Sequence, residues 1–205
     1  PEIRFEDREE YAFAMSAAPR SAEVWKAQLL AGRIEPRTAR ECGRLLGHLH
    51  AGTWHNVQVA TALADRQIFD ELRIDPYYRR VREVHPDLAG PLTSLIDSLE
   101  TEQHALVHAD FSPKNLLVHD DGMLMVDFET GHFGDPAFDL GFFLSHLLLK
   151  AVYHAPARSD EMLALTTSFW DGYQPKLRAA IDTADYDALV TRGIRNLGGC
   201  LLARV

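Results

Sequence analysis

Cysteine is scarce in this chain. Cys42 and Cys200 are the only two among 205 residues, and neither belongs to a metal-ligand spacing. We therefore expect two small buried side chains in a reducing compartment, and no disulfide framework. Long apolar runs are also missing, because the longest candidate, residues 142–149, is interrupted by Ser145 and His146. A membrane span needs about 20 apolar residues, and no secretory signal opens the sequence, so we expect a cytoplasmic protein with no membrane partner.

Positive charge is sparse, and so are the usual phosphate-binding signals. The formal net charge is −9, which disfavours a nucleic-acid partner because such a partner favours a concentrated basic face. A neutral or cationic ligand suits this charge slightly better. No G-x-G-x-x-G segment occurs, and no lysine lies in a strand near the start of the chain; the lysines are Lys26, Lys114, Lys150 and Lys176. The chain therefore shows neither a glycine-rich phosphate loop nor the strand lysine that accompanies it.

Helix dominates the secondary structure that the sequence predicts. Strands are expected at residues 3–5 and 11–15, and helices are expected over residues 21–31, 36–51, 65–72, 88–99, 135–149, 159–173 and 186–202. Asp75-Pro76 is typical of a helix start with proline at the first position, while residues 52–64 give no clear pattern. With 46% hydrophobic residues the chain can bury one sizeable core. We expect a mainly helical α+β fold.

A short hairpin is predicted in the middle of the chain. Residues 116–118 and 123–126 are apolar and flank Asp120-Asp121-Gly122, a turn signal. The hairpin carries the chain out and back. We therefore expect Asn115 and Asp127 to finish at the same end, close enough to share a cation.

The residues around this hairpin have the spacing of a kinase catalytic loop. His108, Asp110 and Asn115 form H-x-D-x-x-x-x-N, and Asp127 follows at the end of an apolar run. Phosphoryl transfer needs a carboxylate that orients the acceptor hydroxyl and oxygen ligands for Mg²⁺ that bridges the phosphates. Asp110 is the candidate catalytic base. Asn115 and Asp127 are the candidate ligands for Mg²⁺ and hence for ATP.

Two further residues are expected to support this loop. His108 is expected to brace the loop by hydrogen bonding, and Asp139 to accept hydrogen bonds from loop backbone N–H groups. Asp139 lies one helical turn beyond Asp135, the expected cap of the helix that begins there. Lys114 either touches the γ-phosphate or is solvated. Glu129 either supports a second metal, faces the substrate or has no role.

The start of the chain is interpreted as the end of an N-terminal lobe. Residues 1–19 would hold the last strands of that lobe and a hinge, and residues 20–205 a helical catalytic and substrate lobe. Met15, Ser16 and Ala17 would offer backbone groups to the adenine of ATP, although an ordinary strand-to-helix connection explains them equally well. Because the glycine-rich loop and strand lysine are missing, we expect that the rest of the N-terminal lobe is absent through truncation, disorder or evolutionary loss.

Histidine offers an alternative site. His48, His50 and His55 suggest a metal centre, but no matching carboxylate or cysteine pattern accompanies them, so helix-face and loop positions explain them better. A metallophosphohydrolase would use His119 together with His108, Asp110 and Asp127. No second histidine–carboxylate cluster supports that alternative.

Three segments carry a family resemblance: HADFSPKN at residues 108–115, VDFE at residues 126–129 and GDPAFDLG at residues 134–141. In these, and more weakly in LLGHLH at residues 45–50, the sequence resembles the aminoglycoside phosphotransferase family, a group that includes choline and homoserine kinases of the protein-kinase-like fold. The resemblance covers the hinge and the C-terminal lobe. It implies that Asp110 is the catalytic base and that Asn115 and Asp127 hold magnesium.

The resemblance also bears on the acceptor. D-F-E stands where protein kinases have D-F-G, and no A-P-E segment follows, so a small molecule is expected rather than a protein. The function predicted is ATP-dependent transfer of phosphate to a hydroxyl of a metabolite or an aminoglycoside-like compound. The alternative is a non-catalytic binding module derived from a kinase. No motif identifies the acceptor or the oligomeric state.

Overall fold

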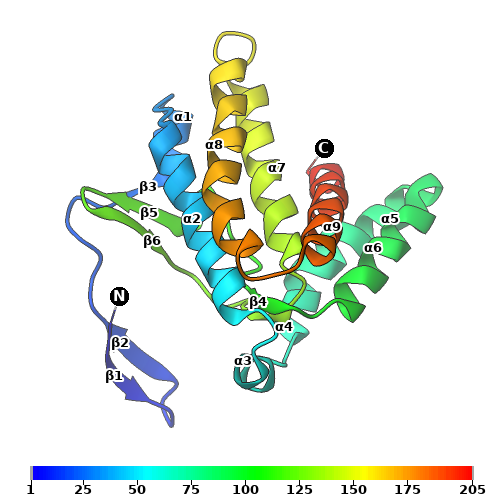
Figure 1. Ribbon diagram of the computed structural model, residues 1–205, viewed down its shortest axis with the longest axis horizontal. Helices are drawn as coiled ribbons and strands as arrows, with labels where there is room; N and C mark the ends of the chain where they lie inside the picture. The colour runs from blue at the N-terminus through cyan, green and yellow to red at the C-terminus, as the bar shows by residue number, and fades with distance from the viewer. Residues whose placement is uncertain (1, 205) are drawn as a thin grey trace.

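The computed structural model describes residues 2–204 of the chain. Long helices form most of the body together with small groups of strands, and a separate hairpin stands at the N-terminus (Figure 1). This is the mainly helical α+β architecture that the sequence predicts. Within residues 2–204, no helix combines the length and the apolar content needed to cross a membrane.

The strands form three small antiparallel sheets, in the orders β1-β2, β3-β5-β6 and β4-β7. Their bounds are β1 Ile3–Asp7, β2 Ala12–Met15, β3 Glu23–Val24, β4 Ala105–Val107, β5 Leu116–His119, β6 Gly122–Met125 and β7 His132–Gly134. The expected hairpin is therefore confirmed as β5-β6, in which Leu116 pairs with Met125 and His119 with Gly122.

The helices fill the rest of the chain. Their bounds are α1 Trp25–Leu30, α2 Pro36–Thr53, α3 Val57–Ala62, α4 Gln67–Phe69, the wide-turned π-helix η1 Asp70–Arg79, α5 Arg80–Val84, the 3₁₀-helix η2 Pro86–Leu88, α6 Ala89–Thr101, the 3₁₀-helix η3 Pro113–Asn115, α7 Ala137–Tyr153, α8 Ser159–Arg178 and α9 Thr183–Leu202. Residues 52–64, which gave no pattern, contain α3, and the Asn56 side chain caps that helix by accepting from two backbone N–H groups.

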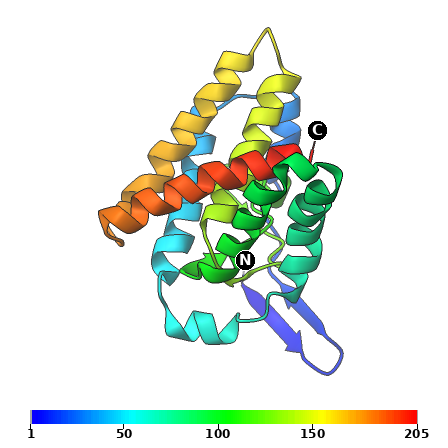
Figure 2. The same cartoon turned by 90° about the vertical axis from the view of Figure 1, so that its right-hand side faces the viewer.

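Helix α7 packs against two apolar clusters, one on each side. On one side Phe143 packs with residues of α1, α2 and α8, among them Trp25 and Phe169. On the other side Phe138 and Phe142 pack with η1, α6 and α9. A helix with apolar residues on every side is expected to be buried, and most of α7 is. Figure 2 shows α9 crossing obliquely over this helix.

Helices α2 and α8 approach closely because each has glycine at the crossing. A Cβ added to Gly43 would stand 2.0 Å from the backbone oxygen of Phe169, and one added to Gly172 would stand 2.0 Å from that of Arg40. Any side chain at either position would push the helices apart. The buried cysteines fit the same interior, since Cys42 and Cys200 are both free and buried, as expected.

The predicted helix over residues 21–31 was wrong at its start. Glu23 and Val24 form β3, paired with Val118 and Leu117 of β5, and the helix begins only at Trp25. Ser21 is therefore not its cap. The pairing partner lies far along the chain, so the local pattern could not reveal it.

The helix start at Asp75-Pro76 was also wrong. Residues 67–84 form one continuous helical run through α4, η1 and α5, and Pro76 lies inside η1. A proline normally clashes with the carbonyl of residue i−4 and removes a hydrogen bond. The wider π-helical turns change that ladder, which lets the proline stand within the run.

Strands β4 and β7 were not anticipated. They pair Ala105 with Gly134 and Val107 with His132, so they bracket the catalytic loop and the irregular stretch that follows it. Three-residue strands leave too short a pattern to recognise. At the C-terminus, α8 continues to Arg178 and α9 begins at Thr183, capped by Asp182, rather than at Tyr186.

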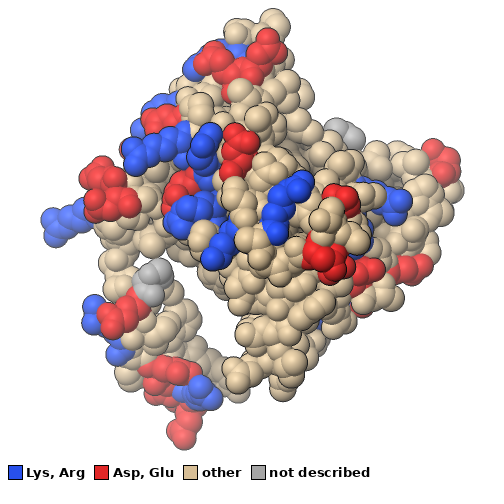
Figure 3. All heavy atoms as spheres, viewed as in Figure 1, with Lys and Arg blue, Asp and Glu red and all other residues tan. Residues whose placement is uncertain are grey.

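The N-terminal hairpin β1-β2 stands apart from the helical body in the view that Figures 1 and 3 share. Its large apolar side chains are exposed, including Ile3, Phe5 and Phe13. Ser16 closes the hairpin, because its N–H donates to the Glu2 oxygen at 2.8 Å and its hydroxyl accepts from the Glu2 N–H at 2.8 Å. The outer ends of the two expected domains, Pro1 and Val205, lie outside the described residues.

Candidate active site

The candidate catalytic loop, residues 108–115, is anchored by hydrogen bonds to Asp139 of α7. Asp139 accepts the backbone N–H of His108 through Oδ2 and that of Ala109 through Oδ1, each at 2.8 Å. Ala109 has a φ of +61°, a conformation rare for a residue with a side chain and found at functional sites. Asp135 caps the same helix, since its carboxylate accepts the Ala137 N–H at 3.0 Å. The contacts expected of Asp139 are present, and its part in catalysis stays a prediction.

Asp139 belongs to a fully buried chain of hydrogen bonds. His50 Nε2 lies 3.2 Å from its Oδ2, and the Tyr173 hydroxyl lies 3.0 Å from His50 Nδ1. Burial raises the pKa of Asp139, but its hydrogen bonds with His50 and with the His108 backbone N–H and the charge of His50 outweigh burial, so the pKa lies below its usual 3.8. The carboxylate is therefore ionised where it receives the loop N–H groups. Among residues 2–204, no group of three or more His, Cys, Asp or Glu is placed to hold a metal.

His108 joins the loop to the end of β6. Its Nε2 lies 3.0 Å from the Val126 oxygen, and the Asp110 N–H donates to its Nδ1 at 3.2 Å. An N–H donor at Nδ1 requires an unprotonated nitrogen there, so Nε2 carries the proton. The Thr130 hydroxyl donates to the His108 oxygen at 3.0 Å. These contacts match the bracing expected of this histidine.

The Asp110 carboxylate is positioned by groups on both oxygens. Asn115 Nδ2 donates to Oδ2 at 2.9 Å and to the Asp110 backbone oxygen at 3.0 Å. Lys114 Nζ lies 2.7 Å from Oδ2, and Arg73 lies 3.1 Å from Oδ1. Only 5% of the Asp110 side chain is exposed. Because Nδ2 of Asn115 faces Asp110, its Oδ1 faces the other way.

Sequence reasoning missed Arg73. Its Nε donates to the Ala109 oxygen at 2.7 Å, and its guanidinium packs 5.6 Å from the centre of the Phe142 ring. The side chain is only 11% exposed. Arg73 thus holds the carbonyl side of the strained residue whose N–H is held by Asp139. One arginine on a helix is no signal by itself, and only the packing of η1 against the loop brings it here.

Asp127 leaves the hairpin at its open end. The Val126 N–H donates to the Asn115 oxygen at 3.0 Å, so the next residue, Asp127, follows beside Asn115. Asp127 is exposed and has a φ of +71°, a second uncommon conformation close to the loop. The sequence predicted that this hairpin would return Asp127 to the end where Asn115 lies, and the Val126 contact agrees.

The donor set fits a magnesium ion. Asn115 and Asp127 supply hard oxygen atoms, one neutral and one charged, at the same end of the hairpin. Mg²⁺ is usually bound by one or two protein ligands with waters and substrate phosphates, so a larger cluster is not required.

The remaining predicted residues are less closely connected. Among residues 2–204, no hydrogen bond links Met15, Ser16 or Ala17 to the catalytic loop. Glu129 is exposed, and its neighbour Phe128 packs 4.5 Å from the His108 ring. The structure therefore brings together the loop and hairpin residues that the sequence predicted, while the hinge stays a prediction.

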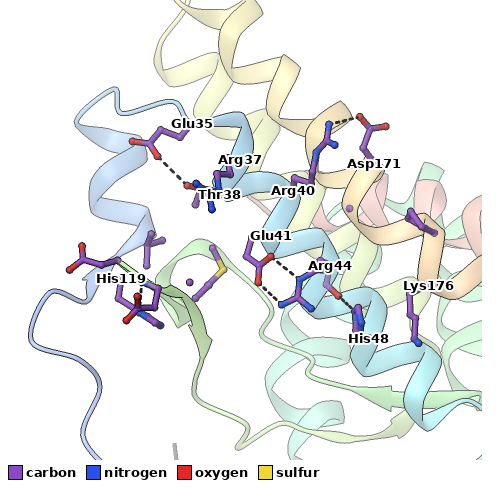
Figure 4. Close-up of a pocket in the computed structure, with 17 residues that line it drawn as sticks. Glu35, Arg37, Thr38, Arg40, Glu41, Arg44, His48, His119, Asp171 and Lys176 are labelled. Carbon is purple, nitrogen blue, oxygen red and sulfur yellow. Dashed lines mark hydrogen bonds and ion pairs between the residues drawn. The ribbon is translucent and has the colours of Figure 1, made fainter.

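A large hollow lies away from these residues. Its volume is about 1030 Å³, and it is bounded by α2, α8 and the tip of the β5-β6 hairpin (Figure 4). None of the catalytic-loop residues lines it. Two of its arginines are paired with acids, Arg44 with Glu41 at 2.5 Å and Arg40 with Asp171 at 3.4 Å. Volume alone does not identify the reacting site here.

Curated relatives are kinases that act on small molecules. Methylthioribose kinase of Enterobacter sp. (strain 638) is 23% identical over 204 residues, covering 83% of this chain and 51% of that protein. Methylthioribose kinase of Yersinia pestis (strain Pestoides F) is 27% identical over 204 residues, covering 83% and 50%. The chain thus spans about half the length of the curated relatives it matches.

Two solved structures share the fold. A glucosamine kinase superposes with a TM-score of 0.53 at 19% identity, over 90% of this chain and 54% of that one. A choline/ethanolamine kinase family protein from Mesorhizobium loti gives a TM-score of 0.52 at 16% identity, over 98% and 78%. The family model described as "Phosphotransferase enzyme family" matches residues 6–180. The predicted resemblance is therefore confirmed, and the chain belongs to the phosphotransferase enzyme family.

Proposed function

We propose that this protein transfers the γ-phosphate of ATP to a hydroxyl of a small molecule. The observation that carries the proposal is the fixing of Asp110: Arg73 reaches one carboxylate oxygen, Lys114 and Asn115 reach the other, and Asp139 anchors the loop beneath. The relatives named methylthioribose kinase and glucosamine kinase support a small-molecule acceptor.

Asp110 would act by orientation. The loose transition state of phosphoryl transfer asks for alignment of the acceptor hydroxyl more than for strong proton abstraction. A buried carboxylate held on both oxygens meets that need, and it accepts the hydroxyl proton as the bond to phosphorus forms. Lys114, half exposed beside it, is placed to swing from Asp110 to a phosphate oxygen.

Asn115 and Asp127 would hold Mg²⁺, which neutralises phosphate charge when it is bound. We also propose residues 1–19 as the end of a nucleotide lobe with its hinge, with Met15, Ser16 and Ala17 beside the adenine. Residues 20–205 would form the helical lobe. A cytoplasmic location accords with this function, because ATP and Mg²⁺ are available there.

The test is release of ADP that depends on a hydroxyl acceptor. The natural gene product and its Asp110→Asn variant are assayed with Mg²⁺·ATP and a panel of sugars, amino alcohols and aminoglycosides. We expect turnover with at least one acceptor in the natural protein, and a loss of at least about 1000-fold in the variant. Turnover that survives Asp110→Asn overturns the role of this residue. Binding of nucleotide and acceptor without any transfer would favour the binding module instead.

A further inference from the structure

A group of basic side chains lies beyond the residues that hold Asp110. His146 and Lys150 are on α7, and Arg204 follows α9 at the end near α5 and α6 (Figure 2). Lys150 is only 7% exposed, and its Nζ donates to the His146 backbone oxygen at 3.3 Å. Arg204 reaches His146 Nε2 at 3.2 Å and the Ser145 hydroxyl at 2.6 Å. We refer to Lys150 and Arg204, with the uncharged His146 that contacts both, as the α7–α9 cation cluster.

The cluster has no acidic partner among the described residues. Within residues 2–204, neither Lys150 nor Arg204 forms an ion pair with a carboxylate. Burial, together with the charges of Lys26 and Arg204, lowers the pKa of Lys150 to about 8. Burial also lowers the pKa of His146 to about 3, aided by Arg204, Lys150, Lys114 and Lys26. All the charged groups that act on these two side chains are cations.

The burial of Lys150 distinguishes this arrangement from the paired charges on the surface. On the face drawn in Figure 3, blue and red side chains lie next to one another. In the hollow of Figure 4 each of Arg40 and Arg44 has its own carboxylate. A largely buried cation without a counter-ion is costly to the fold. Such groups point to a site where the missing charge comes from a ligand.

A continuous path joins the cluster to Asp110. The Phe142 ring has the Arg204 guanidinium 4.7 Å from its centre and the Arg73 guanidinium 5.6 Å from it. Arg73 in turn contacts the Asp110 carboxylate. Tyr77, on the same helix as Arg73, lies 3.4 Å from Arg204 through its hydroxyl. Two side chains, Phe142 and Arg73, therefore link Arg204 to the candidate base through three successive contacts.

We propose that the α7–α9 cation cluster binds an anionic group of the acceptor, a carboxylate or a phosphate, while a hydroxyl of the same molecule reaches Asp110. This inference rests on the proposed function and names its substrate class. The overall charge of −9 favoured a neutral or cationic ligand. The local charge beside the loop has the opposite sign, and a ligand responds to the local charge.

The experiment compares three sugars that differ in charge alone at one end. D-glucose is neutral, D-glucuronate carries a carboxylate and D-glucose 6-phosphate carries a phosphate. Binding is measured by calorimetry without ATP, so it does not depend on turnover, and ADP release is then measured with each sugar. The variants are Lys150→Met and Arg204→Met. The matched control is Lys176→Met, which removes one exposed lysine from α8, at the hollow of Figure 4.

We expect one or both anionic sugars to bind at least about tenfold more tightly than glucose, and each cluster variant to lose about tenfold of that affinity. Lys176→Met should bind as the natural protein does, and the KM for ATP should not change in any variant. Whichever of glucuronate and glucose 6-phosphate binds better identifies the anion. Lys150→Met should also raise the melting temperature, because it removes an unpaired buried charge.

The outcomes separate this inference from the proposed function. Equal binding of the three sugars, or equal losses in Lys176→Met, overturns the anion site even if phosphate transfer occurs. A rise in the KM for ATP alone would also overturn it, since the cluster would then serve the nucleotide. Charge-dependent binding that is lost in Lys150→Met supports the anion site even if no transfer is detected, in which case only the proposed function fails.

Discussion

The guanidinium of Arg73 lies 3.1 Å from the carboxylate of Asp110 and also donates to the carbonyl of Ala109. This contact ties η1 to the loop that carries the candidate base. The Arg73 guanidinium balances the charge of the Asp110 carboxylate and fixes its orientation. Both side chains are largely buried, so little water reaches the contact. Arg73 is thus the residue of η1 that contacts both the candidate base and the residue before it.

Replacing Arg73 tests that connection. We expect Arg73→Met to lower kcat by about 10- to 100-fold, because a shielded charged hydrogen bond is lost, and to leave the KM for ATP unchanged. Arg73→Lys should recover only part of the rate, since lysine cannot bridge two acceptors in a fixed plane. Arg79→Met is the control, because Arg79 pairs with Asp70 on the same helical run. Similar kcat losses in the two methionine variants would contradict a specific role.

Asp127 is expected to act through the cation. Asp127→Ala should weaken Mg²⁺·ATP binding by about tenfold or more, whereas Asp110→Ala should bind Mg²⁺·ATP normally and fail to turn over. Both affinities are measured with a fluorescent nucleotide at several Mg²⁺ concentrations. Unchanged affinity in Asp127→Ala would count against its role as a ligand.

The buried Asp139 network should make stability depend on acid. The pKa of Asp139 lies below its usual 3.8 in the folded protein, so its stabilising contribution is fully present above about pH 4. This contribution is lost as the pH falls through the lowered pKa that Asp139 has in the folded protein. Asp139→Asn should lower the free energy of unfolding by about 3 kcal/mol at pH 7 and flatten the acid limb of the stability curve.

Urea unfolding at several pH values measures this effect. Asp171→Asn on the surface of α8 is the control, and we expect it to follow the natural protein. An acid limb in Asp139→Asn as steep as in the natural protein would show that other groups cause it.

His132 should make stability fall at mildly acidic pH. Burial lowers its pKa from 6.5 to about 4, and only 1% of the residue is exposed. Between these values the unfolded chain binds a proton that the folded protein does not, so stability rises with pH from about 4 to 6.5. His132→Phe keeps an aromatic ring beside Phe69. The free energy of unfolding of the natural protein should differ between pH 6.5 and pH 5, and the variant should reduce that difference by about 2 kcal/mol.

Urea midpoints at pH 6.5 and pH 5 check this expectation. The control is His85→Phe, since His85 is exposed in the loop before η2. The inference fails if the two variants show the same difference between the two pH values.

The crossing of α2 and α8 should tolerate no side chain. Gly43→Ala places a Cβ 2.0 Å from the Phe169 oxygen, and we expect a loss of about 3 kcal/mol or more because backbone cannot move aside cheaply. Gly52→Ala lies in the same helix with nothing within 4 Å. It should stabilise the protein by about 0.5 kcal/mol, since alanine is the better helix former. Thermal unfolding of both variants gives the comparison, and similar melting temperatures would contradict the close packing.

Much of the candidate site was readable from spacing. The H-x-D-x-x-x-x-N pattern, the turn at residues 120–122 and the position of Asp139 after its helix cap are all local features. Their geometry follows from the short distances along the chain. A hairpin must return Asp127 beside Asn115, and a carboxylate in the first turn of α7 must face what packs on that end. For the same reason the apolar run in α7 predicted its burial.

Other features depended on partners far away in the chain. Glu23 is extended because it pairs with Val118, and Pro76 stands inside a helix because η1 has wide turns. His50 is buried because Asp139 and Tyr173 both bind it. A local window contains none of these partners, so the propensities within it cannot report their contribution to the free energy.

The sequence by itself determined the family, the loop, the hairpin and the mainly helical fold, because each follows from residues that lie close together along the chain. Only the tertiary structure decided that Arg73 contacts Asp110 and that Lys150 and Arg204 have no carboxylate partner among residues 2–204. Those side chains come from η1, α7 and the end of α9. Electrostatic interaction depends on distance in space, and the packing of helices sets that distance.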